Sequence, residues 1–188
     1  MRVRSEGREI DVLFQPSRSG QNVVSLGLLS RMIETTAILE PFRNPATGDE
    51  IRDCIVKSIE MRRKQKRSER RKESKKTGDI PKLWILTPTL STKILEQFAA
   101  IPQKSWYDGI YFLPECFRAA ITVIHQLLLS SYTLWLRLLR KGKVQEGSID
   151  ELERLPRNNP FRDGTLKVFY SLFKDLEANK TKNEENQE

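Results

Sequence analysis

The sequence has little of what disulfide-stapled and zinc-binding domains require. Its 188 residues include two cysteines, Cys54 and Cys116, and one histidine, His125. One cysteine pair cannot define a disulfide framework, and a single histidine cannot complete a zinc site with two cysteines. We therefore expect both cysteines to be buried small apolar residues of a cytoplasmic protein, where thiols stay reduced.

Long apolar runs are also lacking. The first residues contain no run that could serve as a signal peptide. The most apolar stretch, 119–139, carries His125, Gln126 and Arg137, and a helix that faces lipid does not tolerate so many polar groups. We interpret this stretch as a buried strand followed by a helix, and we expect no membrane partner.

Familiar catalytic motifs are missing as well. No Gly-x-Ser-x-Gly elbow supports a hydrolase triad, and Gly142-Lys143 lacks the upstream glycine of a phosphate-binding loop. His125 could act as a general base, but a lone histidine in an apolar run is more often a core or rim residue. These absences leave charge pattern and acidic residues as the informative signals.

A dense basic segment is the strongest of these signals. The formal net charge of the chain is +8. The segment 62–76 has ten basic and two acidic residues, which leaves 23 of the 33 basic and 23 of the 25 acidic residues elsewhere. Such a segment suits phosphate through counterion release, although it could equally be a solvated connection without a ligand. The candidate nucleic-acid-binding residues are Arg62, Arg63, Lys64, Lys66, Arg67, Arg70, Arg71, Lys72, Lys75 and Lys76.

Hydrophobic periodicity predicts alternating strands and helices. A capping box formed by Thr47 and Glu50 marks the start of a helix that leads into the basic segment. The fold class that follows is α/β, a central mixed sheet flanked by helices, with one long basic helix. We expect one domain over 1–176 and a polar, disordered tail over 177–188. Predicted strands are 10–14, 37–42, 82–87, 109–113 and 120–124, and predicted helices are 23–33, 91–98, 132–139, 148–155 and 166–176.

Two carboxylates interrupt predicted strands. Asp11 follows Ile10, and Glu40 follows Leu39. Two acids on neighbouring strands can share Mg²⁺, a hard cation that takes oxygen ligands and keeps several waters. Such a metal supports phosphodiester hydrolysis. The alternative is that each acid faces solvent at a strand edge.

Several blocks of the chain resemble a chiefly cyanobacterial family of uncharacterised bacterial proteins. The resemblance covers nearly all of 1–176. It rests on REIDV (8–12), LGLL (26–29), LEPFRNP (39–45), LWILTPT (83–89), GIYFL (109–113), IHQL (124–127) and LWLR (134–137). That family is distantly similar to the PD-(D/E)XK nuclease-like group, which includes recombination-promoting nucleases.

This resemblance implies a nuclease-like fold with Asp11 and Glu40 as the catalytic metal ligands. The group's pattern places a lysine two residues after the second acid, where this chain has Phe42. Lys57, on the following helix, could take that lysine's place. The resemblance therefore suggests a Mg²⁺-dependent deoxyribonuclease with a degenerate active site.

Two functions stay open at this level. The first is a nuclease-like, nucleic-acid-associated protein that hydrolyses phosphodiesters with a metal. The second is a non-catalytic adaptor whose basic helix engages nucleic acid or an acidic partner. The position of Asp11 and Glu40 relative to one another and to a basic residue distinguishes the two, because divergent carboxylates leave only binding.

Overall fold

The computed structural model of this protein describes residues 12–14, 26–71 and 80–138, together with residues 148, 151 and 154. The chain divides into two units, Met1–Gln145 and Glu146–Glu188. The second unit lies almost wholly outside the described residues, so the expectation of a single domain over 1–176 with a tail over 177–188 stays a prediction. All that follows concerns the first unit.

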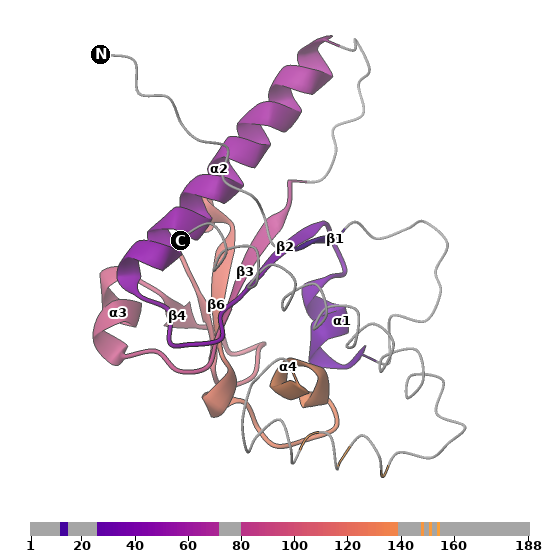
Figure 1. The fold of residues 1–188 in the computed structure, drawn as a ribbon, viewed down its shortest axis with the longest axis vertical. Helices are drawn as coiled ribbons and strands as arrows, with labels where there is room; N and C mark the ends of the chain where they lie inside the picture. The colour runs from indigo at the N-terminus through magenta and orange to yellow at the C-terminus, as the bar shows by residue number, and fades with distance from the viewer. Residues whose placement is uncertain are drawn as a thin grey trace, which may run out of the picture. The chain divides into compact units, whose positions relative to one another are not determined.

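A six-stranded mixed sheet forms the centre of this unit (Figure 1). The strand order is β1-β2-β3-β6-β5-β4. The central pairs β2–β3 and β3–β6 are parallel, whereas β1 joins one edge and β5 and β4 join the other in antiparallel pairs. The strands are β1 (Val12–Phe14), β2 (Ala37–Pro41), β3 (Lys82–Thr87), β4 (Ile101–Pro102), β5 (Ile110–Phe112) and β6 (Ala119–Val123). The predicted α/β class with a mixed sheet is confirmed.

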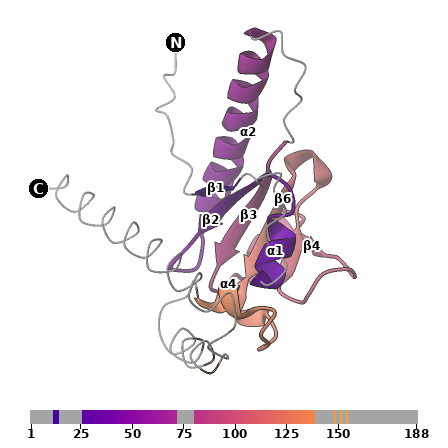
Figure 2. The ribbon, with the colours of Figure 1, turned by 90° about the vertical axis from the view of Figure 1, so that its right-hand side faces the viewer.

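Helices cover both faces of the sheet, as the turned view in Figure 2 shows. One buried cluster joins the α2 residues Ile51 and Cys54 to Leu83 and Ile85 of β3. The other joins α1 and α4 to the alternate β3 residues, which include Trp84. Side chains of a strand alternate between faces, so an apolar run such as β3 requires both layers. The helices are α1 (Leu28–Met32), α2 (Gly48–Arg71), α3 (Thr92–Gln97) and α4 (Leu134–Leu138), and the 3-10 turns are η2 (Glu115–Phe117) and η3 (Ile124–Gln126).

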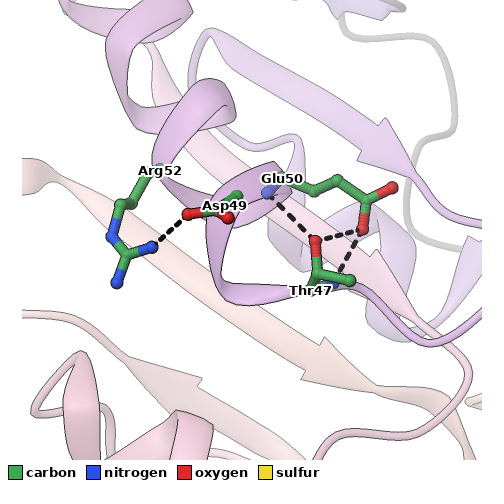
Figure 3. Close-up of polar contacts among 4 residues, drawn as sticks. All are labelled: Thr47, Asp49, Glu50 and Arg52. Atoms are coloured by element: carbon green, nitrogen blue, oxygen red, sulfur yellow. Dashed lines mark hydrogen bonds and ion pairs between the residues drawn. The ribbon is translucent and has the colours of Figure 1, made fainter.

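The start of α2 is set by local hydrogen bonds that the sequence predicted (Figure 3). The backbone N–H of Glu50 donates to Thr47 Oγ1 at 3.3 Å, and the backbone N–H of Thr47 donates to Glu50 Oε2 at 2.7 Å. This reciprocal pair is a capping box, which satisfies N–H groups that no helical carbonyl can reach. Asp49 forms an ion pair with Arg52 one turn later. The register of α2 is therefore fixed from its first turn.

One side-chain prediction needs correction. Cys54 is buried, as expected, but Cys116 is exposed, because it lies in the 3-10 turn η2 outside both clusters. Trp84 and Trp135 are core residues, whereas Trp106 is only half-buried in the loop between β4 and β5. Among the described residues, no helix has the length and apolar character needed to cross a membrane.

Candidate functional site

Glu40 is a buried acid in the middle layer of the molecule. It lies on β2 next to Ile85 of β3, and the residue is 1% exposed. Glu40 is two residues away from Ile38, which belongs to the cluster beneath α2. Because every second side chain of a strand points to the same side, both lie on the α2 face of the sheet. A carboxylate removed from water in this way needs a cationic or hydrogen-bonding partner. The expectation that this acid faces solvent at a strand edge does not hold.

Lys57 of α2 supplies that partner. Its Nζ lies 3.1 Å from Glu40 Oε2, close enough for a hydrogen bond and an ion pair. The side chain of Lys57 is 19% exposed and that of Glu40 is 2% exposed. Charge-assisted hydrogen bonds in such surroundings are stronger than neutral ones, because little water screens them. The sheet and the helix thus bring together two of the three predicted catalytic residues.

The packing of α2 explains why Lys57 reaches this position. The buried positions Ile51, Cys54, Ile55 and Ser58 form the stripe that contacts the sheet. Lys57 flanks this stripe, so its aliphatic stem crosses apolar surface before its ammonium group meets the carboxylate.

Phe42 occupies the position where the nuclease-like pattern has a lysine. Its side chain is partly buried against the cluster beneath α2, on the same face as Glu40. Its backbone N–H donates to Leu86 O at 2.7 Å, which extends the contact between β2 and β3. An aromatic ring therefore packs where that pattern has an ammonium group, and the lysine beside Glu40 comes from α2.

The other predicted metal ligand, Asp11, lies outside the described residues. Within the described part of the chain, no three histidine, cysteine, aspartate or glutamate side chains gather into a group that could hold a metal. His125 is exposed in η3. The catalytic roles of Asp11, Glu40 and Lys57 stay predictions.

The basic residues follow the buried part of α2. Arg62 is half-buried, and the next four described cations are exposed: Arg63, Lys64, Lys66 and Arg67. In Figures 1 and 2 the last turns of α2 extend beyond the ends of the neighbouring strands. Arg70 and Arg71 complete the helix, while Lys72, Lys75 and Lys76 lie outside the described residues. A helix segment with no apolar face cannot pack on a hydrophobic core, so its charged side chains face solvent or a bound ligand.

The structure also contains a concave region that the sequence did not predict. A pocket at the start of β3 is lined by Lys82, Trp106 and Arg118, among others. Of these three residues, Lys82 alone falls in a predicted element, the strand 82–87. The one available signal was a lysine that opens an otherwise apolar strand.

No protein-family model matches the chain, and comparison with curated proteins and with solved structures finds no significantly similar protein.

Proposed function

We propose that this protein is a nuclease-like, nucleic-acid-associated protein of the PD-(D/E)XK type that hydrolyses phosphodiesters with Mg²⁺. The observation that supports the proposal is the 3.1 Å contact between Lys57 Nζ and Glu40 Oε2. An acid paired with a lysine on one face of a mixed sheet is the combination such a site needs. It is present here although Phe42 replaces the lysine of the usual pattern.

The second acid in this proposal is Asp11. In the β1–β2 pair, Phe14 lies opposite Ala37, and Val12 lies opposite Leu39. One further step in the same register would pair position 11 with Glu40. Residues directly opposite in an antiparallel pair place their side chains on the same face. The proposal depends on this extension, because a cation held beside Glu40 needs a second carboxylate in this scheme.

Each side chain has a defined role in this scheme. Carboxylate oxygens of Glu40 and Asp11 would hold the cation, and Mg²⁺ bound there would supply polarisation of the phosphate and acidification of a water. Lys57, released from part of its pairing with Glu40, would stabilise the negative charge that develops on phosphate oxygens. Attack by the water oxygen on phosphorus breaks the bond to the leaving oxygen, which takes up a proton from solvent. The water's own proton passes to solvent.

A cleavage assay tests this proposal. The wild-type protein is incubated with linear, supercoiled and single-stranded DNA, with Mg²⁺ or Mn²⁺. We expect cleavage, and we expect Asp11→Asn and Glu40→Gln each to reduce its rate by about 100-fold or more, because one charged ligand is lost. Glu96→Gln, an exposed acid on α3, is the matched control and should cleave as the wild type does. Circular dichroism checks that each variant is folded.

Two outcomes contradict the proposal. Cleavage that persists in Asp11→Asn and Glu40→Gln would place the activity elsewhere or in a contaminant. A wild-type protein that cleaves none of these substrates would remove the catalytic function. Mn²⁺ binding, followed by electron paramagnetic resonance, separates a protein that binds metal without turnover from one that has no site.

The exposed end of α2 favours a second candidate function, a non-catalytic adaptor that binds a polyanion. In the described part of the chain, none of Arg63, Lys64, Lys66 and Arg67 forms an ion pair with a carboxylate. These cations are therefore available to phosphates without first breaking an internal contact. Because no aromatic residue interleaves them, we expect binding without base stacking and with little sequence preference.

Salt dependence tests the adaptor function. The double variant Lys64→Ser/Arg67→Ser should bind duplex DNA more weakly, and the slope of log affinity against log salt should fall by about 2, since two phosphate contacts are lost. Lys93→Ser/Lys104→Ser removes two exposed lysines far from α2's end in sequence and serves as the matched control. Equal slopes for the two double variants would exclude the end of α2 as the binding surface.

A further inference from the structure

A pocket of about 440 Å³ lies where β3 and β6 begin and β5 ends. Its polar lining includes Lys82 at the start of β3, together with Glu115 and Arg118 around the turn η2. Its apolar lining includes Trp106 and Phe112. Concave sites of this size, apolar with a few convergent polar groups, are typical of small-molecule binding.

The ammonium group of Lys82 is held among aromatic rings. Its Nζ lies 4.3 Å from the ring centroid of Phe112, 4.5 Å from that of Trp84 and 5.5 Å from that of Trp106. Ring faces attract a cation but accept none of its hydrogen bonds in the way an oxygen does. Among the described residues, no carboxylate lies within 4.0 Å of this nitrogen. The rings therefore position the charge and leave its donors for another partner.

Neighbouring charges make the pocket net positive. Arg118, at its wall, donates from Nη2 to Ile80 O at 3.2 Å. Arg31 lies 4.0 Å from the ring centroid of Trp106 and donates from Nη1 to Ser105 O at 2.8 Å. Burial, and then the positive charge of Arg118, lower the pKa of Lys82, while Glu115 acts in the opposite direction. A bound anion would relieve this concentration of positive charge.

The backbone around the pocket is strained at two positions. Ala99 has a φ of 47° and Arg118 a φ of 49°, and they are the two non-glycine residues with positive φ in the described ranges. Both line the pocket. The left-handed region is unfavourable for a residue with a side chain, because its Cβ lies too close to the following carbonyl oxygen, and such strain is concentrated at functional sites. Here it shapes the wall that carries the Arg118 guanidinium group.

We propose that this pocket binds a small organic anion of nucleotide size, with its phosphate on Lys82 and Arg118 and its planar ring against the apolar wall. The apolar wall includes Phe112 and Ile101, the latter 63% exposed on the edge strand β4. Gln103 offers an amide that can donate to or accept from a ring edge. The shared chemistry is a phosphate ester with an attached planar base, either as a free nucleotide or as the 5′ end of a nucleic acid.

This site is distinct from the Glu40–Lys57 pair. Lys82 lies opposite Ala37 and Glu40 lies opposite Ile85, so the two side chains are three residues apart along the sheet. They also lie on opposite faces, because Lys82 contacts Trp84, whereas Glu40 contacts Lys57 of α2. The inference does not depend on phosphodiester hydrolysis.

Isothermal titration calorimetry at fixed salt tests the proposal with the full chain. The probes are the four common nucleoside 5′-monophosphates, the matching nucleosides, inorganic phosphate, and a short oligonucleotide with and without a 5′-phosphate. Each is tested to about 10 mM, which detects binding in the weak millimolar range. We expect at least one monophosphate to bind about tenfold or more tightly than its nucleoside and than inorganic phosphate, because only it engages both walls. The two oligonucleotides show whether the ligand is a free nucleotide or a chain end.

Three variants locate the binding. Lys82→Met keeps the apolar stem among the rings and removes the charge. Arg118→Gly removes the guanidinium group and suits the positive φ. Each should weaken binding by about tenfold or more, while Lys93→Met, an exposed lysine outside the pocket lining, should leave it unchanged. Thermal melting checks that the two pocket variants are folded. If only one of them folds, that variant alone is enough to test the location of the site.

Each remaining outcome overturns the proposal. In the first, no monophosphate binds. In the second, the nucleoside or inorganic phosphate binds as tightly as the monophosphate. In the third, Lys82→Met and Arg118→Gly both keep wild-type affinity. Glu40→Gln should bind the monophosphates as the wild type does, so a failure here is distinguishable from a failure of the nuclease proposal.

Discussion

Lys57→Met should destabilise the fold by an amount that depends strongly on pH. The substitution keeps the length of the side chain and removes the ammonium group that lies 3.1 Å from Glu40 Oε2. With the Glu40 side chain 2% exposed, water cannot replace that ammonium group. Removal of one member of a buried ion pair costs about 3–5 kcal/mol, because the remaining charge is left in a medium that solvates it poorly.

Protonation sets an upper limit to this loss. A glutamate can always become neutral, and its protonation costs about 4 kcal/mol at pH 7 but about 1 kcal/mol at pH 5. We therefore expect Lys57→Met to lower the free energy of unfolding by about 3 kcal/mol at pH 7 and by about 1 kcal/mol at pH 5. The direction of this pH dependence follows from proton binding at Glu40. In the folded variant Glu40 takes up a proton more readily than in the unfolded chain, so a lower pH reduces the loss of stability relative to the wild type.

Urea unfolding, followed by tryptophan fluorescence at both pH values, measures this difference. Trp84, Trp106 and Trp135 all lie in the unit Met1–Gln145, so the signal follows the unit that contains the ion pair. Lys93→Met, at an exposed position, should change stability by less than about 0.5 kcal/mol.

Replacement of both partners completes the test. Glu40→Leu combined with Lys57→Met should recover most of the stability, because no buried charge remains. A loss of less than about 1 kcal/mol in Lys57→Met at pH 7, or the same loss at both pH values, would refute the reasoning that a charged pair is buried here.

Three further substitutions test local features of the fold, each by urea unfolding. Thr47→Ala should cost about 1 kcal/mol, because the backbone N–H of Glu50 loses its acceptor, and an unchanged midpoint would mean that the cap adds nothing. Trp84→Ala should lower the free energy of unfolding by about 3–5 kcal/mol, because Trp84 is 1% exposed and its Nε1 donates to Met32 O at 2.9 Å. A loss below about 0.5 kcal/mol would show that the core does not depend on this ring. Ala99→Gly should raise stability by about 0.5–1 kcal/mol, because the residue after the α3 cap has a φ of 47°, and a loss of stability would show that no strain is relieved.

Local sequence signals predicted the elements that form the sheet and its helices. Thr47 and Glu50 mark the start of α2, as predicted, and Ser91, the first residue of the predicted helix 91–98, caps α3 through its side chain. The predicted strand 82–87 has the same bounds as β3. These features depend on residues within one or two turns of each other, so hydrogen bonding and periodicity along the chain are enough to specify them. The two-residue strand β4 was missed, since it is too short to carry a pattern.

Only the tertiary structure decided which side chains meet. Sequence spacing allowed Lys57 to substitute for a lysine near Glu40, but the 3.1 Å contact requires α2 to pack across the face that carries Ile38 and Glu40. The pocket depends even more on topology, since Lys82 and Arg118 are brought together by the parallel pairing of β3 with β6. Single residues at the ends of separate strands leave no periodic signal, because their proximity is set by strand order and crossover, which sequence periodicity does not specify.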